Sequence, residues 1–399
     1  MANCVSCGRE LPSFSTGELK NLCPDCQHSI TTSSGGPALP APSQRVQVVR
    51  RRPPVTTALI ALNVLVYVAM VLRGVSPLTP TGAQLLPWGA NWGPLSLGHQ
   101  PWRILASNYV HVGVLHIALN MWCLWNMGWL AELIFDAWTY ALLYTVCGIA
   151  GGLASLAWHP LSVGAGASGA IFGIAGALIA ALYLGHLPIP KEALRGTLKS
   201  LVMFAIYNLA FGAVAGIIDN SAHIGGLVAG LALGAVLSKH LRTPPEDRAA
   251  WRRGVFAVAA VALVAGLLLV QRLNGYVVLL EQGNEAYQQG KLDDAARSLM
   301  QAAARKPNDR QTLYLLSSTY MRQQQFSRAI PILQHEVQLD PSNEDVQLDL
   351  GVAHFQLGEF DEAIPYLQKA VQLNPKDDDA QKSLQEALFQ KKMKANSSK

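Results

Sequence analysis

Seven long apolar segments follow one another between residues 55 and 271, separated by polar or Pro- and Gly-rich stretches. Each is close to the roughly 20 residues that a helix needs to cross a bilayer. The segments lie at 55–73, 112–132, 137–157, 167–186, 200–218, 222–240 and 254–271. This pattern predicts an all-α polytopic membrane protein with seven spans.

Positive charges gather before the first of these segments and in two of the stretches that connect them. Lys and Arg are enriched in the cytoplasmic loops of membrane proteins. They precede the first segment and lie between the fourth and fifth and between the sixth and seventh: Arg45, Arg50, Arg51, Arg52; Lys191, Arg195, Lys199; Lys239, Arg242, Arg248, Arg252, Arg253. A multi-pass path through the cell membrane with a cytoplasmic N-terminus puts all of them inside. The part that follows the seventh span is then expected to be extracytoplasmic.

The composition agrees with a membrane protein that carries soluble parts. Charged residues are 14% of the 399 residues and apolar residues are 50%, against an ordinary charged share of about 25%. Residues 1–275 hold 17 Lys or Arg and 9 Asp or Glu, whereas residues 276–399 hold 14 and 17. Because the positive excess lies beside the spans, we expect the lipid bilayer as its partner and no nucleic acid.

Four cysteines near the start of the chain have the spacing C-x2-C, fifteen residues, C-x2-C: Cys4, Cys7, Cys23 and Cys26. This spacing predicts a structural zinc site that resembles a zinc ribbon, in a domain over residues 1–28. The metal would supply the folding energy that so short a segment lacks. A pair of disulfides or an iron site are the alternatives, and a cytosolic location favours zinc. Residues 29–54, rich in Ser, Thr, Gly and Pro, are expected to be a flexible linker.

A 34-residue period begins after the seventh span. Three residue types recur in phase: Pro307, Pro341 and Pro375; Ala295, Ala329 and Ala363; Leu299, Leu333 and Leu367. The pattern resembles tetratricopeptide repeats, in which each unit is a pair of helices. We expect three repeats from 274 to 375 and a capping helix, so that this α-solenoid domain covers 274–392. Such stacks present a concave surface, and a protein or peptide ligand is the expected partner.

Two membrane segments begin with a reactive side chain among small residues. Ser168 opens the fourth segment, and His223 near the start of the sixth shares a helix face with Gly226 and Gly230. Small residues let membrane helices approach closely, and an ionisable residue in a membrane segment suggests function. A serine nucleophile needs an adjacent base, most often histidine. Ser168 and His223 are therefore candidates for that pair, and helix packing is the alternative reading of Ser168.

These stretches resemble the rhomboid family of intramembrane serine proteases. The resemblance rests on GASGAIFG around Ser168, on AHIGGLVAG around His223, and on a third block with Trp102-Arg103 followed by His111, His116 and Asn120. It covers residues 55–240 and implies a six-helix core.

The resemblance implies a catalytic dyad, with Ser168 as the nucleophile and His223 as the base and later the acid, and no catalytic cofactor. His116 and Asn120 lie four residues apart, so they share a helix face. By resemblance, these two side chains and the Ser168 backbone N–H would hold the oxyanion. The alternative is that His116 and Asn120 only bond between helices.

The resemblance also implies that Arg103 anchors the long loop over 75–102 beside the active site. Phe172, one turn after Ser168, is expected to stack on the imidazole of His223. His111 and His159 have weaker cases and are expected to be loop or packing residues. Glu132 is expected to hold helices together.

The predicted function is cleavage of the transmembrane segments of membrane proteins near the outer face by this dyad. The alternative is a catalytically inactive rhomboid-like scaffold that binds membrane proteins through its core and its repeats. Retention of Ser168, His223 and the oxyanion residues favours the protease, because a scaffold needs none of them.

Overall fold

The computed structural model describes Cys7, Cys26 and residues 53–185, 191–215, 218–239, 241 and 245–397. Residues Pro53–Lys399 form one compact unit. Its described part is helical, and one isolated bridge pairs Asn91 with Gly164. The predicted all-α class is confirmed.

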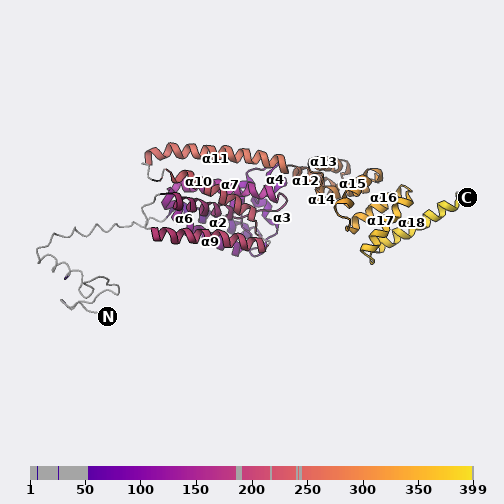
Figure 1. The fold of residues 1–399 in the computed structure, drawn as a ribbon, viewed down its shortest axis with the longest axis horizontal. Coiled ribbons are helices and arrows are strands. Elements are labelled where there is room, and N and C mark those ends of the chain that lie inside the picture. The colour runs from indigo at the N-terminus through magenta and orange to yellow at the C-terminus, as the bar shows by residue number, and fades with distance from the viewer. Residues whose placement is uncertain are drawn as a thin grey trace. The chain divides into compact units, whose positions relative to one another are not determined.

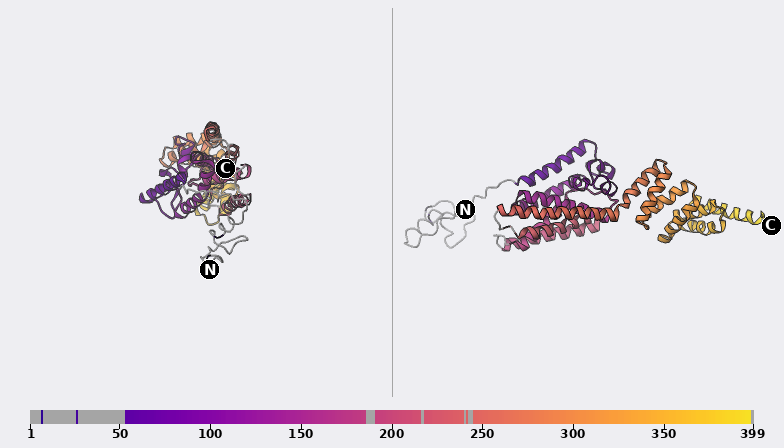
Figure 2. Two further views of the ribbon diagram at one scale, coloured as in Figure 1. Left: turned by 90° about the vertical axis from the view of Figure 1, so that its left-hand side faces the viewer. Right: turned by 90° about the horizontal axis from the view of Figure 1, so that it is seen from above.

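All seven predicted spans are helices: α2 (Pro54–Leu72), α6 (Val114–Phe135), α7 (Ala137–Trp158), α8 (Ser168–Leu184), α9 (Lys191–Ala215), α10 (Asn220–Ser238) and α11 (Pro245–Asn274). They lie side by side in one bundle (Figures 1 and 2). Five of the helices in the described ranges are long and apolar enough to cross a membrane alone. Arg103–Tyr109 and α6 together form a sixth candidate span, which is broken by a bend of 91°.

Three of the spans differ in length from the sequence prediction. Helix α9 has 25 residues and begins at Lys191, whereas the apolar pattern gave 200–218. Helix α8 has 17 residues, about 26 Å at 1.5 Å per residue, which is shorter than the roughly 30 Å hydrocarbon core. Helix α11 has 30 residues, whereas the apolar pattern alone gave 254–271, because the helix continues into polar residues at both ends.

Helix α8 is the centre of the bundle. Its residues are apolar all round and nearly all of them are buried, as expected for a helix enclosed by others. The glycines of α10 face its backbone: an added Cβ at Gly226 would collide with the carbonyl oxygen of Gly169, and one at Gly230 with that of Gly173. The backbones of α8 and α10 therefore touch, as the glycine stripe predicts.

Glu132 near the end of α6 holds the start of α2. Its carboxylate accepts hydrogen bonds from the backbone N–H groups of Val55 and Thr56, both at 3.0 Å, and from the Thr56 hydroxyl at 2.9 Å. The first N–H groups of a helix have no partner within it, so this carboxylate replaces a side-chain cap. The expectation that Glu132 joins helices is confirmed.

The loop between α2 and α6 is folded into short helical turns: α3 (Gly82–Leu85), η1 (Leu86–Trp88), α4 (Gly93–Ser96), α5 (Arg103–Ala106) and η2 (Ser107–Tyr109). Arg103 is buried among them and donates to the carbonyl oxygens of Leu86 at 2.6 Å and Ala90 at 3.3 Å. Its Nε also donates to Gln100 Oε1 at 2.6 Å. Arg103 is therefore the anchor of this loop, as expected.

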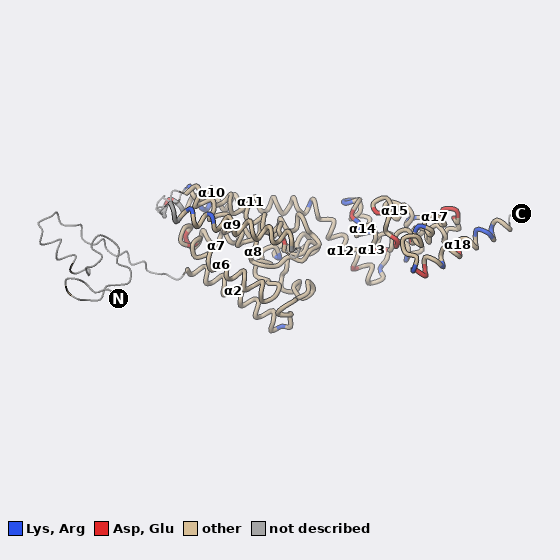
Figure 3. Tube along the Cα trace, turned by 60° about the horizontal axis from the view of Figure 1, so that its bottom comes forward, with Lys and Arg blue, Asp and Glu red and all other residues tan. Residues whose placement is uncertain are grey.

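The C-terminal part consists of three helix pairs and a last helix. The pairs are α12 (Tyr276–Gln288) with α13 (Leu292–Arg305), α14 (Arg310–Arg322) with α15 (Phe326–Leu339), and α16 (Glu344–Gln356) with α17 (Phe360–Leu373), and α18 (Asp378–Ser397) follows. The in-phase Ala and Leu positions are all buried. Charged residues gather in these helices and near the ends of the membrane bundle (Figure 3).

The repeats meet the bundle where α11 passes into α12. The Asn274 side-chain amide donates to the carbonyl oxygens of Leu156 at 2.9 Å and Ala157 at 2.8 Å, which are among the last four of α7. Gln271 donates to the carbonyl oxygen of Leu97 at 3.0 Å, and Val277 is fully buried. The first repeat is thus fixed to the end of α7 and to the loop between α2 and α6.

Candidate active site

Ser168 is the first residue of α8 and is half-buried. A residue at this position has a backbone N–H without a partner in its own helix. The positive end of the helix dipole also lies here, which favours a negative charge. Ser168 therefore combines a hydroxyl and a free donor at the place where an oxyanion would be stabilised.

The loop before Ser168 is shaped by Gly166. Its φ of 131° is a conformation that favours glycine, and its N–H donates to the Ser107 carbonyl oxygen at 2.9 Å. An added Cβ at Gly166 would lie only 2.9 Å from His116 Nε2. The imidazole of His116 is thus packed on the backbone two residues before Ser168.

His116 has one ring nitrogen engaged in its own segment. The backbone N–H of Val112 donates to His116 Nδ1 at 3.2 Å. Because that nitrogen accepts, the neutral ring carries its proton on Nε2, the atom that faces Gly166. His116 is therefore arranged as a donor beside the start of α8.

Asn120 lies one turn further along α6 and is buried. Its Nδ2 donates to the carbonyl oxygen of His116 at 2.9 Å. An amide nitrogen carries two hydrogens, so one remains for a ligand. His116 and Asn120 lie on one face of α6, as their spacing predicts.

His223 is 6% exposed and lies in the first turn of α10. Its ring stacks on that of Phe172, with centroids 4.1 Å apart and an interplanar angle of 10°. Phe172 is one turn after Ser168 on α8, so the stack brings the imidazole to the serine's helix. The described side chains of Ser168 and His223 form no hydrogen bond with each other. This does not exclude the pair, because catalytic hydrogen bonds are often long before substrate binds.

Asp219 positions the helix that carries His223. Its Oδ1 accepts a hydrogen bond from the backbone N–H of Ala222 at 3.1 Å, the arrangement of an N-cap. The sequence analysis did not assign a role to this residue. The signal was present, because Asp followed by an apolar run is a helix start.

His111 and His159, the two histidines with the weaker sequence case, lie in different places. His111 is fully buried, and its ring centroid lies 5.4 Å from that of His116, so it packs behind the candidate oxyanion donor. His159 lies outside this group, with Nδ1 3.4 Å from the Ser221 hydroxyl. Both match the packing or loop roles that the sequence predicts.

The predicted zinc site falls largely outside the described residues. Cys4 and Cys23 are not described, and Cys7 and Cys26 are described only singly. Among described residues, no group of three or more His, Cys, Asp or Glu could hold a metal ion. The zinc site stays a prediction.

Comparisons with known proteins match both the membrane part and the repeats. A rhomboid domain profile matches residues 98–240, and two tetratricopeptide repeat profiles match residues 280–344 and 323–388. The first tetratricopeptide repeat domain of Spaghetti (RPAP3), solved bound to the HSP90 peptide SRMEEVD, is 25% identical with a TM-score of 0.27. That alignment covers 29% of this chain and 90% of the solved chain.

Two relatives are rhomboid proteins by name. The rhomboid protease GluP of Bacillus subtilis is 32% identical over 306 residues, which cover 76% of this chain and 58% of the relative. The mitochondrial RHOMBOID-like protein 6 of Arabidopsis thaliana is 33% identical over 225 residues, which cover 52% of this chain and 71% of the relative. With these relatives, a matching domain profile and a bundle of apolar helices, the chain is a multi-pass membrane protein that belongs to the rhomboid family.

Proposed function

We propose that the chain is an intramembrane serine endopeptidase that cleaves transmembrane segments of membrane proteins near the outer face. The observation that carries this proposal is the stack of His223 on Phe172, one turn from Ser168. It is supported by relatives that are named as rhomboid proteases.

In this mechanism Ser168 Oγ attacks the carbonyl carbon of the scissile peptide bond, and the imidazole of His223 takes the hydroxyl proton. The carbonyl oxygen becomes an oxyanion, which the Ser168 N–H, His116 Nε2–H and Asn120 Nδ2–H can receive. The imidazolium then gives its proton to the leaving amine as the C–N bond breaks. Water, deprotonated by the same imidazole, hydrolyses the acyl-enzyme and restores Ser168.

The short α8 explains how hydrolysis can occur within a membrane protein. Because α8 is shorter than the hydrocarbon core, a serine at its outer end lies below the membrane surface. His116 packs on Gly166, two residues before Ser168, and in this proposal its polar ring lets water reach the serine. An inactive scaffold would need no such donor.

Replacement of either dyad member tests the proposal. We expect Ser168→Ala and His223→Ala each to abolish cleavage of a model membrane substrate in nanodiscs, because the two residues act as a unit. His159→Ala, a histidine outside the site, is the matched control and should cleave normally. Normal turnover by the His223→Ala protein would contradict the dyad.

We also propose that the N-terminus is cytoplasmic and the repeats extracytoplasmic, on the side of Ser168. The bonds of Asn274 to the end of α7 and of Gln271 to Leu97 support this placement, because both contacts lie at the end of the bundle where α8 begins. A cysteine at the exposed Gln301 should react with an impermeant thiol reagent in intact cells. Protection until lysis would contradict the outside placement.

For the two ends of the chain we propose a structural zinc at Cys4, Cys7, Cys23 and Cys26 and a peptide-binding role for the repeats. Four thiolates form a closed site that leaves no position for catalysis. Metal analysis should give one zinc per chain that is lost in Cys4→Ser, with cleavage unchanged. Iron, or no metal in the intact protein, would overturn the site.

A further inference from the structure

The middle repeat departs from its two neighbours at one buried position. The residues 34 apart at this position are Ala302, Glu336 and Ala370. Both alanines are fully buried, and Glu336 is 7% exposed. A carboxylate in place of a buried methyl group costs free energy unless its oxygens find partners. The structure shows a partner for only part of it.

That partner is Ser317, whose hydroxyl donates to Glu336 Oε1 at 2.7 Å. Its equivalents in the other repeats are Gly283 and Gly351, so the middle repeat has exchanged a Gly and Ala pair for Ser and Glu. Within the described residues, Glu336 Oε2 accepts no hydrogen bond. Half of the carboxylate is therefore free to accept from a ligand.

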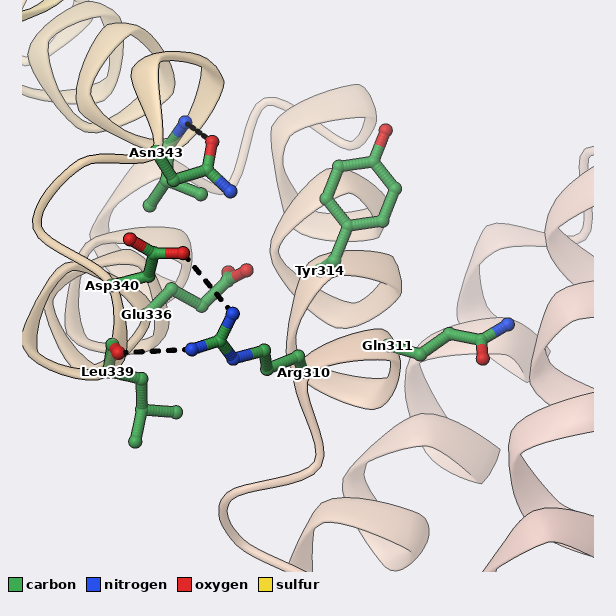
Figure 4. A pocket seen from close by; sticks show the side chains of 8 residues that line it. Arg310, Gln311, Tyr314, Glu336, Leu339, Asp340 and Asn343 are labelled. Atoms are coloured by element: carbon green, nitrogen blue, oxygen red, sulfur yellow. Dashed lines mark hydrogen bonds and ion pairs between the residues drawn. The ribbon is translucent and has the colours of Figure 1, made fainter. Parts of the chain in front are cut away.

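The free oxygen belongs to a residue that lines a pocket of about 230 Å³ between α14, α15 and α16. Figure 4 shows the Glu336 carboxylate between Asp340 and Tyr314, directed into this space. Tyr314 is 52% exposed, and Gln311 and Asn343 on the wall are exposed as well. The pocket can thus be entered from solvent, and its volume exceeds that of several waters, each about 30 Å³.

The charge around the pocket is negative. Residues 310–356 hold five Asp or Glu and three Arg. Of the three, only Arg310 lines the pocket, and it is paired with Asp340 at 3.2 Å and with the Leu339 carbonyl oxygen at 3.3 Å. The other two lie over aromatic rings, Arg322 on Tyr287 and Arg328 on Tyr320. No cation of this segment is left for Glu336.

The neighbouring carboxylates make the ionised form of Glu336 less favourable unless a cation is bound nearby. Burial, and then the charge of Asp349, raise the pKa of Glu336 to about 7. Burial and the charge of Asp345 likewise raise the pKa of Asp349 to about 6. A positive charge nearby would favour the ionised form of both groups.

We infer that this pocket binds a Lys or Arg side chain of an extended peptide segment. The Glu336 carboxylate accepts from the cation, and the exposed ring of Tyr314 packs on it. The inference deepens the proposed peptide-binding role of the repeats and rests on it. The competing explanation is that Glu336 only joins α15 to Ser317 on α14.

Binding of matched peptides to the full chain in nanodiscs separates these explanations. The probes are fluorescent decapeptides of Ser, Ala and Leu with one central Lys, and twins with a central norleucine or Glu. In the wild type we expect the Lys peptide to bind about tenfold or more tightly than the norleucine twin, the effect of one charge-assisted hydrogen bond. Glu336→Ala, which restores the residue of the neighbouring repeats, and Glu336→Gln should remove this preference. Glu362→Gln, an exposed acid on α17, should keep it.

Several results would overturn the inference. Peptides that bind without a Lys preference, or with a preference that survives Glu336→Ala, would contradict the pocket and leave the peptide-binding role standing. A shifted melting temperature of Glu336→Ala with unchanged affinities would assign Glu336 to the Ser317 contact alone. If none of the peptides bound to any variant at millimolar concentration, the peptide-binding role would fall together with the inference.

Discussion

The membrane core and the repeat domain both pack helices through small residues, but they differ in what those residues face. In the core, Gly226 of α10 lies against the backbone carbonyl of Gly169 on α8. In the repeats, Gly351 of α16 lies against the side chain of Leu367 on α17. A leucine side chain can change rotamer to make room, whereas a helix backbone cannot move without moving the whole helix. The first contact is therefore rigid and the second adaptable.

The difference matches what each region does in our account. The core must hold Ser168 and His223, which lie on two helices, beside the same scissile peptide bond. Misplacement of such a side chain by about 1 Å can cost two orders of magnitude in rate. The repeats can accept changes such as Ser317 and Glu336 without loss of the helix pair, because each unit contacts only its neighbours. Chemistry is thus placed on rigid contacts, and recognition on adaptable ones.

Among the changes that test this comparison of core and repeats, the largest effect is expected for Gly226→Ala. The new methyl group would collide with the Gly169 carbonyl and push α10 away from α8, so cleavage should fall by on the order of a hundredfold. Overpacking of this kind also destabilises by about 1–3 kcal/mol or more. Turnover and thermal unfolding in the same detergent check both effects.

Gly254→Ala on α11 is the matched control, because an added Cβ there meets nothing within 4 Å. It should leave cleavage unchanged and stabilise the fold by up to the roughly 1 kcal/mol that Ala gains over Gly in a helix. Equal activity of the two variants would mean that the contact between α8 and α10 is not rigid.

A smaller effect is expected for Gly351→Ala in the repeats. The methyl group would lie 2.6 Å from Leu367 Cγ and 3.1 Å from the Leu367 backbone nitrogen. The leucine side chain therefore has to shift, and Ser317 at the equivalent position of the middle repeat shows that a side chain fits there. The cost of overpacking is partly offset by the roughly 1 kcal/mol that Ala gains over Gly in a helix. We expect a net change within about 1 kcal/mol and unaltered cleavage. A loss of cleavage as large as that of Gly226→Ala would remove the distinction between the two regions.

The last prediction concerns the pH dependence of the stability of the repeats and involves no change in cleavage. The pKa of Glu336 is about 7 in the folded state against an ordinary 4.5, so between these values the folded chain binds more protons than the unfolded chain. The free energy of unfolding therefore falls as pH rises from about 4.5 to 7 and is flat above. Each unit of raised pKa corresponds to about 1.4 kcal/mol.

Glu336→Gln should remove this decline while the smaller one from Asp349, whose pKa is about 6, remains. Denaturant unfolding of the intact chain, followed at pH 5 and pH 8, measures the difference. A variant with the same pH profile as the wild type would show that Glu336 is not buried as described.

The sequence predicted the fold because its signals were periodic. Seven apolar runs became seven helices, and the 34-residue phase of Ala295, Ala329 and Ala363 became the buried crossings of three helix pairs. Helix ends were less accurate, as α11 shows, because polar residues can extend a helix once its apolar part is fixed by packing. The glycine stripe of α10 also predicted its close approach to α8.

The sequence did not show contacts between residues far apart in the chain, because no regular spacing marks such contacts. The capping of α7 by Asn274 depends on how the helices pack, because Asn274 lies far along the chain from Leu156 and Ala157, whose carbonyl oxygens it contacts. Glu336 was visible as a departure from the repeat, but only its burial and the pocket beside it gave the departure a meaning.

The central claim is that Ser168 is a nucleophile activated by His223. It is tested most directly by reaction of the intact protein in nanodiscs with a fluorophosphonate probe, followed by mass spectrometry of the labelled peptide. The account predicts a single adduct on Ser168 in the wild type, strong loss of labelling in His223→Ala and normal labelling in His159→Ala. Labelling of Ser168 that is unchanged in His223→Ala, or a wild type that never reacts, would contradict it and favour the inactive scaffold.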